Sequence, residues 1–193
     1  MNKEAVFKRE LEYIKDERIK KACLEMIKLL PDYFFEIPAS STGKYHPAYA
    51  LGEGGLLRHT KAATFFGYVL LKNPAIGDKY TQKEKDMMLM GLMLHDGVKS
   101  GVPKEKYTRF DHPLLMADMI MDNEEKLGLE MEEIEFICDV IRTHMGVWTT
   151  DYKGVEVLEK PKTKYQNFVH MCDYLAAQKE ILIPFDENNN ISV

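Results

Sequence analysis

The sequence predicts an all-α fold, and three observations support this. Apolar residues recur at helical spacing over most of the chain, Pro- and Gly-rich segments separate the periodic runs, and the alternation typical of strands is almost absent. Helices are expected over residues 3–30, 55–72, 82–95, 113–126, 130–145 and 163–180. The chain has 193 residues without an internal repeat or a linker, so a single domain is expected over residues 1–193.

Prolines end the first two expected helices. Residues 3–30 place apolar side chains at helical spacing between Lys and Glu, and Pro31 stops the helix. Residues 55–72 follow the same pattern and end at Asn73-Pro74. Between them, residues 38–55 are rich in Pro, Gly, Ser and Ala, which predicts a loop. Loops of this length inside a compact domain are often functional.

The later helices begin or end at equally recognisable positions. Thr81 and Glu84 form a capping-box pattern in front of the Met-rich run 82–95, whose methionines are expected to fill the core. Pro113 occupies a favourable first position of the next helix. Gly146 ends the helix after that one, and a small hairpin is possible in the irregular segment that follows.

The composition indicates a globular protein of a reducing compartment. Hydrophobic residues make up 45% and charged residues 30%, and the net charge of −5 creates no field that favours nucleic acid or an anionic membrane. No apolar run reaches the length of a membrane span, and the N-terminus lacks the apolar core of a signal peptide. Cys23, Cys138 and Cys172 are far apart and form no paired motif. A cytoplasmic location is therefore expected.

The most unusual feature is the pair His95-Asp96 at the end of an apolar helix. A buried carboxylate without a partner costs roughly several kcal/mol or shifts its pKa. A bound metal cation removes that cost. Asp96 is able to bridge two ions, because a carboxylate has two oxygens with several lone pairs.

Other candidate ligands lie on separate segments, also in apolar settings. They are His59, His112, His144 and Asp173. Each has a simpler alternative, since His112 can cap a helix, His144 can interact with a helix dipole and Asp173 can pair with a lysine. The simpler explanations would have to be true for all of these residues at once. A single site that binds all of them explains the pattern more simply. His46 and His170 are interpreted as surface or core histidines, with His170 as a reserve ligand on the face of Asp173.

The ordered motifs make the sequence similar to the HD-domain superfamily of metal-dependent phosphohydrolases, from about residue 35 to 176. They are Gly54-Gly55-Leu56-Leu57-Arg58-His59-Thr60, His95-Asp96-Gly97-Val98-Lys99 and Thr143-His144-Met145-Gly146, followed by Asp173. With Pro38-Ala39 and His46-Pro47-Ala48-Tyr49, the chain most resembles the HD domain of bacterial 3′–5′ exoribonucleases. Two positions depart from the family pattern, because the motif glycine stands one place early at Gly97 and Met145 replaces a second histidine.

The resemblance implies an HD-type helical bundle with a metal site between its helices. Residues 35–176 would form the HD core, residues 1–34 an N-terminal helix and residues 177–193 a peripheral tail. The family pattern places one metal ion on His59, His95, Asp96 and Asp173. It places a second on His112 and His144, with Asp96 as the bridge. Imidazole and carboxylate ligands suit manganese, iron, nickel, cobalt or zinc, as one or two ions.

Phosphoryl chemistry also needs cations near the metal. Lys99 is the first choice, because it follows Asp96 by three residues and matches the family lysine, so Asp96 and Lys99 are the expected catalytic residues. Arg58, Arg109 and Arg142 each adjoin a ligand segment and are candidates to bind phosphate, with plain surface charge as the alternative. Glu53 either orients a ligand histidine or is a simple loop carboxylate.

The first hypothesis is therefore a phosphohydrolase acting on a nucleotide, a cyclic nucleotide or a short oligonucleotide. Because the net charge is −5, we do not expect long nucleic acid as a partner. A second hypothesis is a mixed-valence di-iron oxygenase, a chemistry that the superfamily also contains. A third is a nucleotide-binding module without activity. Neither the oligomeric state nor the exact substrate follows from the sequence.

Overall fold

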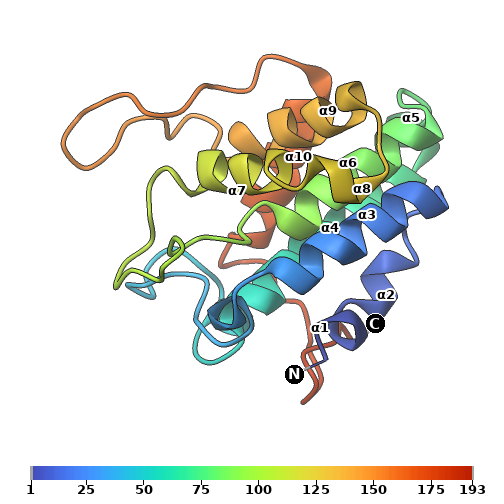
Figure 1. Cartoon of the computed structure of the whole chain (residues 1–193). Coiled ribbons are helices and arrows are strands. Elements are labelled where there is room, and N and C mark those ends of the chain that lie inside the picture. The colour runs from blue at the N-terminus through green and yellow to red at the C-terminus, as the bar shows by residue number, and fades with distance from the viewer. Residues whose placement is uncertain (1, 193) are drawn as a thin grey trace.

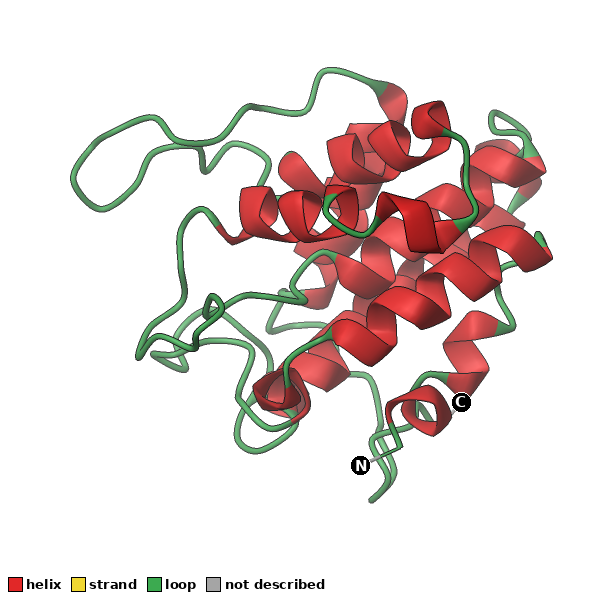
Figure 2. Ribbon diagram, in the orientation of Figure 1, coloured by secondary structure: helices red, strands yellow, loops and turns green. Residues whose placement is uncertain are grey.

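The computed structural model describes residues 2–192 and confirms the all-α fold (Figures 1 and 2). Within these residues there is no sheet, only isolated antiparallel bridges between Thr150 and Glu156 and between Phe185 and Ile191. The longer helices are α3 (Glu17–Leu29), α4 (Gly55–Lys72), α6 (Gln82–Leu94), α7 (His112–Met121), α9 (Met131–Arg142) and α10 (Lys164–Ala176). The short ones are α1 (Lys3–Val6), α2 (Lys8–Leu11), α5 (Pro74–Gly77) and α8 (Glu124–Leu127), with 3₁₀ turns η1 (Asp32–Phe35) and η2 (Ala48–Ala50).

Helix α6 is the central helix of the bundle. It packs against α3, α4, α9 and α10, and every residue from Asp86 to Leu94 is buried. The capping box predicted at its start is present, since Thr81 and Glu84 exchange both hydrogen bonds. Its methionines are buried, which confirms that they fill the core. A buried central helix directs whatever follows its last residue into the interior of the bundle.

The prediction of one helix over residues 3–30 is wrong. The chain forms α1, α2 and α3, with a break over residues 12–16. The Asp16 side chain caps α3 by accepting a hydrogen bond from the Arg18 amide at 2.8 Å, while the Asp16 amide donates to Asp86 Oδ2 at 2.8 Å. Tyr13 and Ile14 lie buried within the break. Apolar periodicity continued through this segment, but the cap and the link to α6 stop the helix there.

Other boundaries shift by a few residues, and the C-terminal tail packs against the bundle. The helix expected over 113–126 ends at Met121 and α8 follows it, and the one expected over 130–145 ends at Arg142. In the tail, Ile183 and Ile191 are 8% and 3% exposed and belong to the hydrophobic core. The side-chain oxygen of Asn190 accepts a hydrogen bond from Lys61 Nζ on α4 at 2.9 Å.

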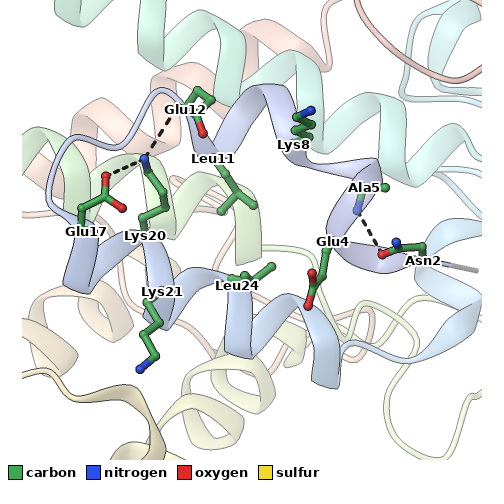
Figure 3. A pocket seen from close by; sticks show the side chains of 10 residues that line it. All are labelled: Asn2, Glu4, Ala5, Lys8, Leu11, Glu12, Glu17, Lys20, Lys21 and Leu24. Carbon is green, nitrogen blue, oxygen red and sulfur yellow. Dashed lines mark hydrogen bonds and ion pairs between the residues drawn. The ribbon is translucent and has the colours of Figure 1, made fainter.

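The long loops gather at one end of the bundle. Residues 38–54, 97–111 and 143–163 all extend from the side of the molecule drawn at the left of Figure 1. The Thr150–Glu156 bridge lies in the last of these loops, where a small hairpin was expected. A groove of about 440 Å³ lies elsewhere, between α1, α2 and α3, and is lined mainly by charged side chains of both signs (Figure 3). Among helices within residues 2–192, none is long and apolar enough to cross a membrane.

Candidate metal centre

The six side chains predicted as ligands meet in one buried cluster. His59 comes from α4 and Asp173 from α10. His95 and Asp96 follow α6, His112 begins α7, and His144 follows α9. The histidine side chains and Asp96 are at most 2% exposed, whereas the Asp173 side chain is 17% exposed. The cluster therefore opens to solvent beside Asp173.

One half of the cluster surrounds Asp96 Oδ2. His59 Nε2 and His95 Nε2 lie 3.6 and 3.5 Å from this oxygen and 3.4 Å from each other. Asp173 Oδ1 lies 2.9 Å from His59 Nε2 and 3.5 Å from His95 Nε2. Two imidazole nitrogens and two carboxylate oxygens thus face a common point.

The other half surrounds Asp96 Oδ1. His112 Nε2 lies 3.0 Å and His144 Nε2 lies 3.7 Å from this oxygen, and the two nitrogens are 3.2 Å apart. The carboxylate of Asp96 consequently directs one oxygen at each pair of histidines. This is the arrangement that a bridging carboxylate requires.

Backbone carbonyls set the protonation of three of the histidines. In each case Nδ1 lies within hydrogen-bond distance of the carbonyl three residues earlier, which can only accept, so Nδ1 carries a proton, and in the neutral imidazole Nε2 carries a lone pair. The pairs are His95 with Leu92 at 2.7 Å, His112 with Arg109 at 2.6 Å and His144 with Ile141 at 2.7 Å. These lone pairs point into the cluster.

Several acceptor atoms of the cluster face one another, and a cation fits this need, although Lys99 Nζ donates to Asp96 Oδ2 at 2.5 Å. When the imidazoles are neutral, the Nε2 atoms of His95, His112 and His144 do not donate, and Asp96 Oδ1 has no hydrogen-bond donor within residues 2–192. His59 Nδ1 is also buried and has no partner within residues 2–192. Electron-rich atoms this close repel each other unless a positive charge lies between them. Imidazole with carboxylate is a donor set for divalent transition metals.

The electrostatics of the cluster keep its two carboxylates charged and His144 neutral. Burial opposes a charge on His95, but Asp96 and Asp173 outweigh it and raise the pKa of His95. Burial raises the pKa of Asp96, but the Lys99 ammonium and His95 outweigh it and hold the pKa well below its usual value. Burial likewise opposes the charge of Asp173, and its contacts with His59 and His95 hold that pKa well below the usual value. Burial lowers the pKa of His144 to about 4. Two charged carboxylates and a neutral His144 are the forms that coordinate metals.

The turn after Asp96 is fixed by close packing. A Cβ at Gly97 would lie 2.6 Å from Leu30 Cδ2 and 2.7 Å from Met116 Sδ, so any other residue would force these buried side chains to move. Tyr33, which the sequence analysis did not single out, accepts a hydrogen bond from the Ser100 amide at 3.1 Å and donates one to the Gly101 carbonyl at 3.0 Å. Both contacts hold the segment that carries Asp96 and Lys99.

A family model described as "HD domain" matches residues 56–178, which is most of the chain. The chain belongs to the HD-domain family. HD-domain proteins are in general metal-dependent phosphohydrolases that bind divalent metals. No curated protein and no solved structure matches the chain, so the likeness to exoribonucleases receives no support from named relatives.

Of the cations predicted near the HD motif, Lys99 lies in the cluster. It is 8% exposed, and its Nζ lies 2.5 Å from Asp96 Oδ2. Arg142, the last residue of α9, is partly exposed and makes no ion pair within residues 2–192. Its guanidinium is therefore not neutralised by a carboxylate of these residues.

The other two predicted cations are occupied by the protein itself. Arg58 donates to the backbone carbonyls of Tyr49, Leu51 and Glu53 and to the Asn189 side chain. It thereby ties the preceding loop and the C-terminal tail to α4. Arg109 forms ion pairs with Asp111 at 2.5 Å and Glu105 at 2.8 Å, which neutralise its charge. Both guanidinium groups are thus held by the protein, which does not favour either arginine as a phosphate ligand.

Two histidines set aside in the sequence analysis touch the cluster. The His46 ring meets the His59 ring edge-to-face at 4.8 Å, and burial lowers the pKa of His46 to about 3. His170 Nδ1 donates to the backbone carbonyl of His144 at 2.7 Å. The position of His170 three residues before Asp173 was the signal for its proximity. Glu53 is exposed in its loop.

Proposed function

We propose that this HD-domain protein hydrolyses a phosphoester or phosphodiester bond of a nucleotide, a cyclic nucleotide or a short oligonucleotide, with two divalent metal ions held by the cluster. The observation that carries the proposal is the position of Asp96. Its two oxygens face separate histidine pairs, His59 with His95 and His112 with His144. Asp173 completes the first half of the cluster.

The chain supplies the ligands and the charges around the reaction. Ions held there would lower the pKa of a coordinated water toward neutrality and polarise a phosphoryl oxygen. Lys99 stands against the bridging carboxylate, at 2.5 Å from Asp96 Oδ2, where its ammonium can meet the charge that develops on phosphate. Arg142, two residues before His144 in the chain, is a candidate for a second cation.

A small substrate suits the charge of this protein. The net charge is −5, and a long polyanion needs many cationic contacts along its length. A nucleotide or short oligonucleotide needs only a few local cations, and Lys99 lies in the cluster itself.

The test is a substrate panel assayed with manganese. Nucleoside monophosphates, cyclic nucleotides and dinucleotides are incubated with the wild type, with Asp96→Asn and with the control Glu25→Gln, which changes an exposed ion pair on α3. We expect release of phosphate or nucleotide by the wild type and the control, and loss of turnover in Asp96→Asn. Turnover by Asp96→Asn at the wild-type rate would overturn the assignment.

Two outcomes of the same panel lead to other functions. The donor set of four histidines and two aspartates also fits two irons. Oxygen consumption by an iron-loaded protein without hydrolysis would favour an oxygenase. Tight nucleotide binding without any turnover would favour a binding module.

A further inference from the structure

An exposed aromatic cluster adjoins the metal centre, and we call it the Trp148 platform. It consists of Trp148, His170 and Tyr174. The Trp148 and Tyr174 rings are nearly parallel, at an interplanar angle of 18° with centroids 6.3 Å apart. The His170 ring meets Trp148 edge-on, with centroids 6.2 Å apart. Trp148 is 53% exposed and Tyr174 is 44% exposed, so large parts of both rings face solvent.

The platform belongs to the same two segments that carry metal ligands. Trp148 follows His144 by four residues, and Tyr174 follows Asp173 directly. His170 joins the segments, because its Nδ1 donates to the His144 carbonyl at 2.7 Å. The platform is therefore tied to the ligand segments by short stretches of chain and one partly buried hydrogen bond.

A glycine places Trp148 against α10. Gly146 has φ of +66°, and a Cβ there would lie 2.1 Å from the His170 ring. The chain therefore turns tightly over His170 after His144. The Trp148 amide then bonds to the Met145 carbonyl at 3.3 Å, which fixes the backbone that carries the indole. An exposed tryptophan held this firmly is organised for contact with a ligand.

The platform shares α10 with the most exposed of the predicted ligands. The Asp173 side chain is 17% exposed, and the other predicted ligands are at most 2% exposed. His170 lies one helical turn before Asp173 on the same face of α10, and Tyr174 follows it directly. A phosphate bound at Asp173 would therefore have these side chains of α10 nearby.

We propose that the Trp148 platform is the base-binding subsite of this protein, on which a purine or pyrimidine ring stacks while the attached phosphate reaches the cluster around Asp96. This rests on the proposed function and specifies its substrate class. Indole faces are favourable stacking partners for any base, because every base has a π-face. Two adjacent rings offer far less than the roughly 800 Å² that each partner of a stable dimer buries. This favours a small planar ligand over a second copy of the chain.

Trp148 reports on its own occupancy, because it is the only tryptophan in the sequence. A nucleoside 5′-monophosphate and ribose 5-phosphate are titrated separately at the same manganese concentration while the tryptophan fluorescence is recorded. We expect saturable quenching by the nucleotide and much weaker quenching by the sugar phosphate. Equal quenching by both compounds would overturn the base-binding subsite.

Kinetics of matched variants provide the second readout. Trp148→Ala should raise KM for the nucleotide about 10-fold or more and leave kcat within a few-fold, as for a lost base–aromatic stack. Trp148→Phe should recover most of the affinity, because a flat ring returns. Tyr152→Ala is the control, since Tyr152 is 89% exposed in the hairpin and makes no ring contact with the platform.

The outcomes separate this inference from the proposed function. Turnover of the nucleotide with an unchanged KM in Trp148→Ala and no quenching would overturn the subsite and leave hydrolysis intact. Quenching that depends on the base, without turnover, would support the subsite and contradict hydrolysis. A tryptophan spectrum that shifts with protein concentration, together with a dimer by size-exclusion chromatography, would assign the platform to self-association and overturn the subsite.

Discussion

Glu133 at the start of α9 stabilises the fold through its charge, and its contribution is predicted to depend on pH. The carboxylate is 3% exposed and pairs with Arg18 of α3 at 3.0 Å and with Lys83 of α6 at 2.5 Å. Burial alone would raise its pKa, but the hydrogen bonds from Arg18 and Lys83 lower it from 4.5 to about 2. Glu133 therefore joins three helices around one buried charge.

The magnitude follows from the two pKa values. A pKa of about 2 in the folded protein against 4.5 in the unfolded chain corresponds to about 3.4 kcal/mol at neutral pH, at about 1.36 kcal/mol per unit. Arg18 and Lys83 are 50% and 51% exposed, so solvent screening reduces this to about 2 kcal/mol. Because the folded pKa is the lower one, this stabilisation is complete above pH 4.5 and is lost as the pH falls toward 2.

Urea unfolding of the wild type and Glu133→Gln, followed by circular dichroism at pH 7 and pH 3, measures this contribution. We expect Glu133→Gln to be less stable by about 2 kcal/mol at pH 7 and the difference to shrink by more than half at pH 3. Glu25→Gln, which removes an exposed partner of Lys28, should leave the unfolding midpoint nearly unchanged. A difference between wild type and Glu133→Gln that is equal at both pH values would refute the assignment to charge.

Two further predictions concern the metal centre. Lys99→Met should lower kcat by roughly 100-fold or more, while the metal content stays at the wild-type value. Steady-state kinetics and elemental analysis would measure these two quantities. An unchanged kcat would exclude Lys99 from the reaction. Manganese at about 100 times its dissociation constant should stabilise the fold by about 2.7 kcal/mol and raise Tm by roughly 5–10 °C in differential scanning fluorimetry, and a chelator should reverse this. No shift in Tm with any divalent transition metal would contradict binding to the folded cluster.

The cluster was predictable because several of its residues are polar side chains at the ends of apolar helical segments in the sequence. His95 and Asp96 end an apolar helix, and His144 stands just before Gly146 at the end of another. Such residues are costly in an apolar setting unless they share a purpose, so several of them together indicate a site. The division of the ligands between the two oxygens of Asp96 was implied by the family resemblance alone, because local patterns do not give the relative positions of α4, α7, α9 and α10.

Other features depend on contacts between distant residues. The break before α3 follows from the Asp16 cap and its link to Asp86, 70 residues away, while apolar periodicity continues through the break. Arg58 adjoins a ligand in sequence, yet its guanidinium is held by nearby carbonyls and by Asn189, 131 residues away. Neighbouring residues on a helix point in different directions, so adjacency to a ligand did not predict proximity to the substrate. The role of Tyr33 could not be predicted from local sequence patterns either, because its hydroxyl contacts a turn 67 residues later in the chain.

The central claim is that the cluster around Asp96 holds divalent metal ions, and metal content tests it most directly. Wild type and Asp96→Asn are loaded with manganese, dialysed and analysed by elemental mass spectrometry, with circular dichroism to verify the helix content. We predict two ions per chain in the wild type and a clear loss in Asp96→Asn with the helices retained. The same metal content in both proteins, or none in the wild type under any loading condition, would contradict the claim.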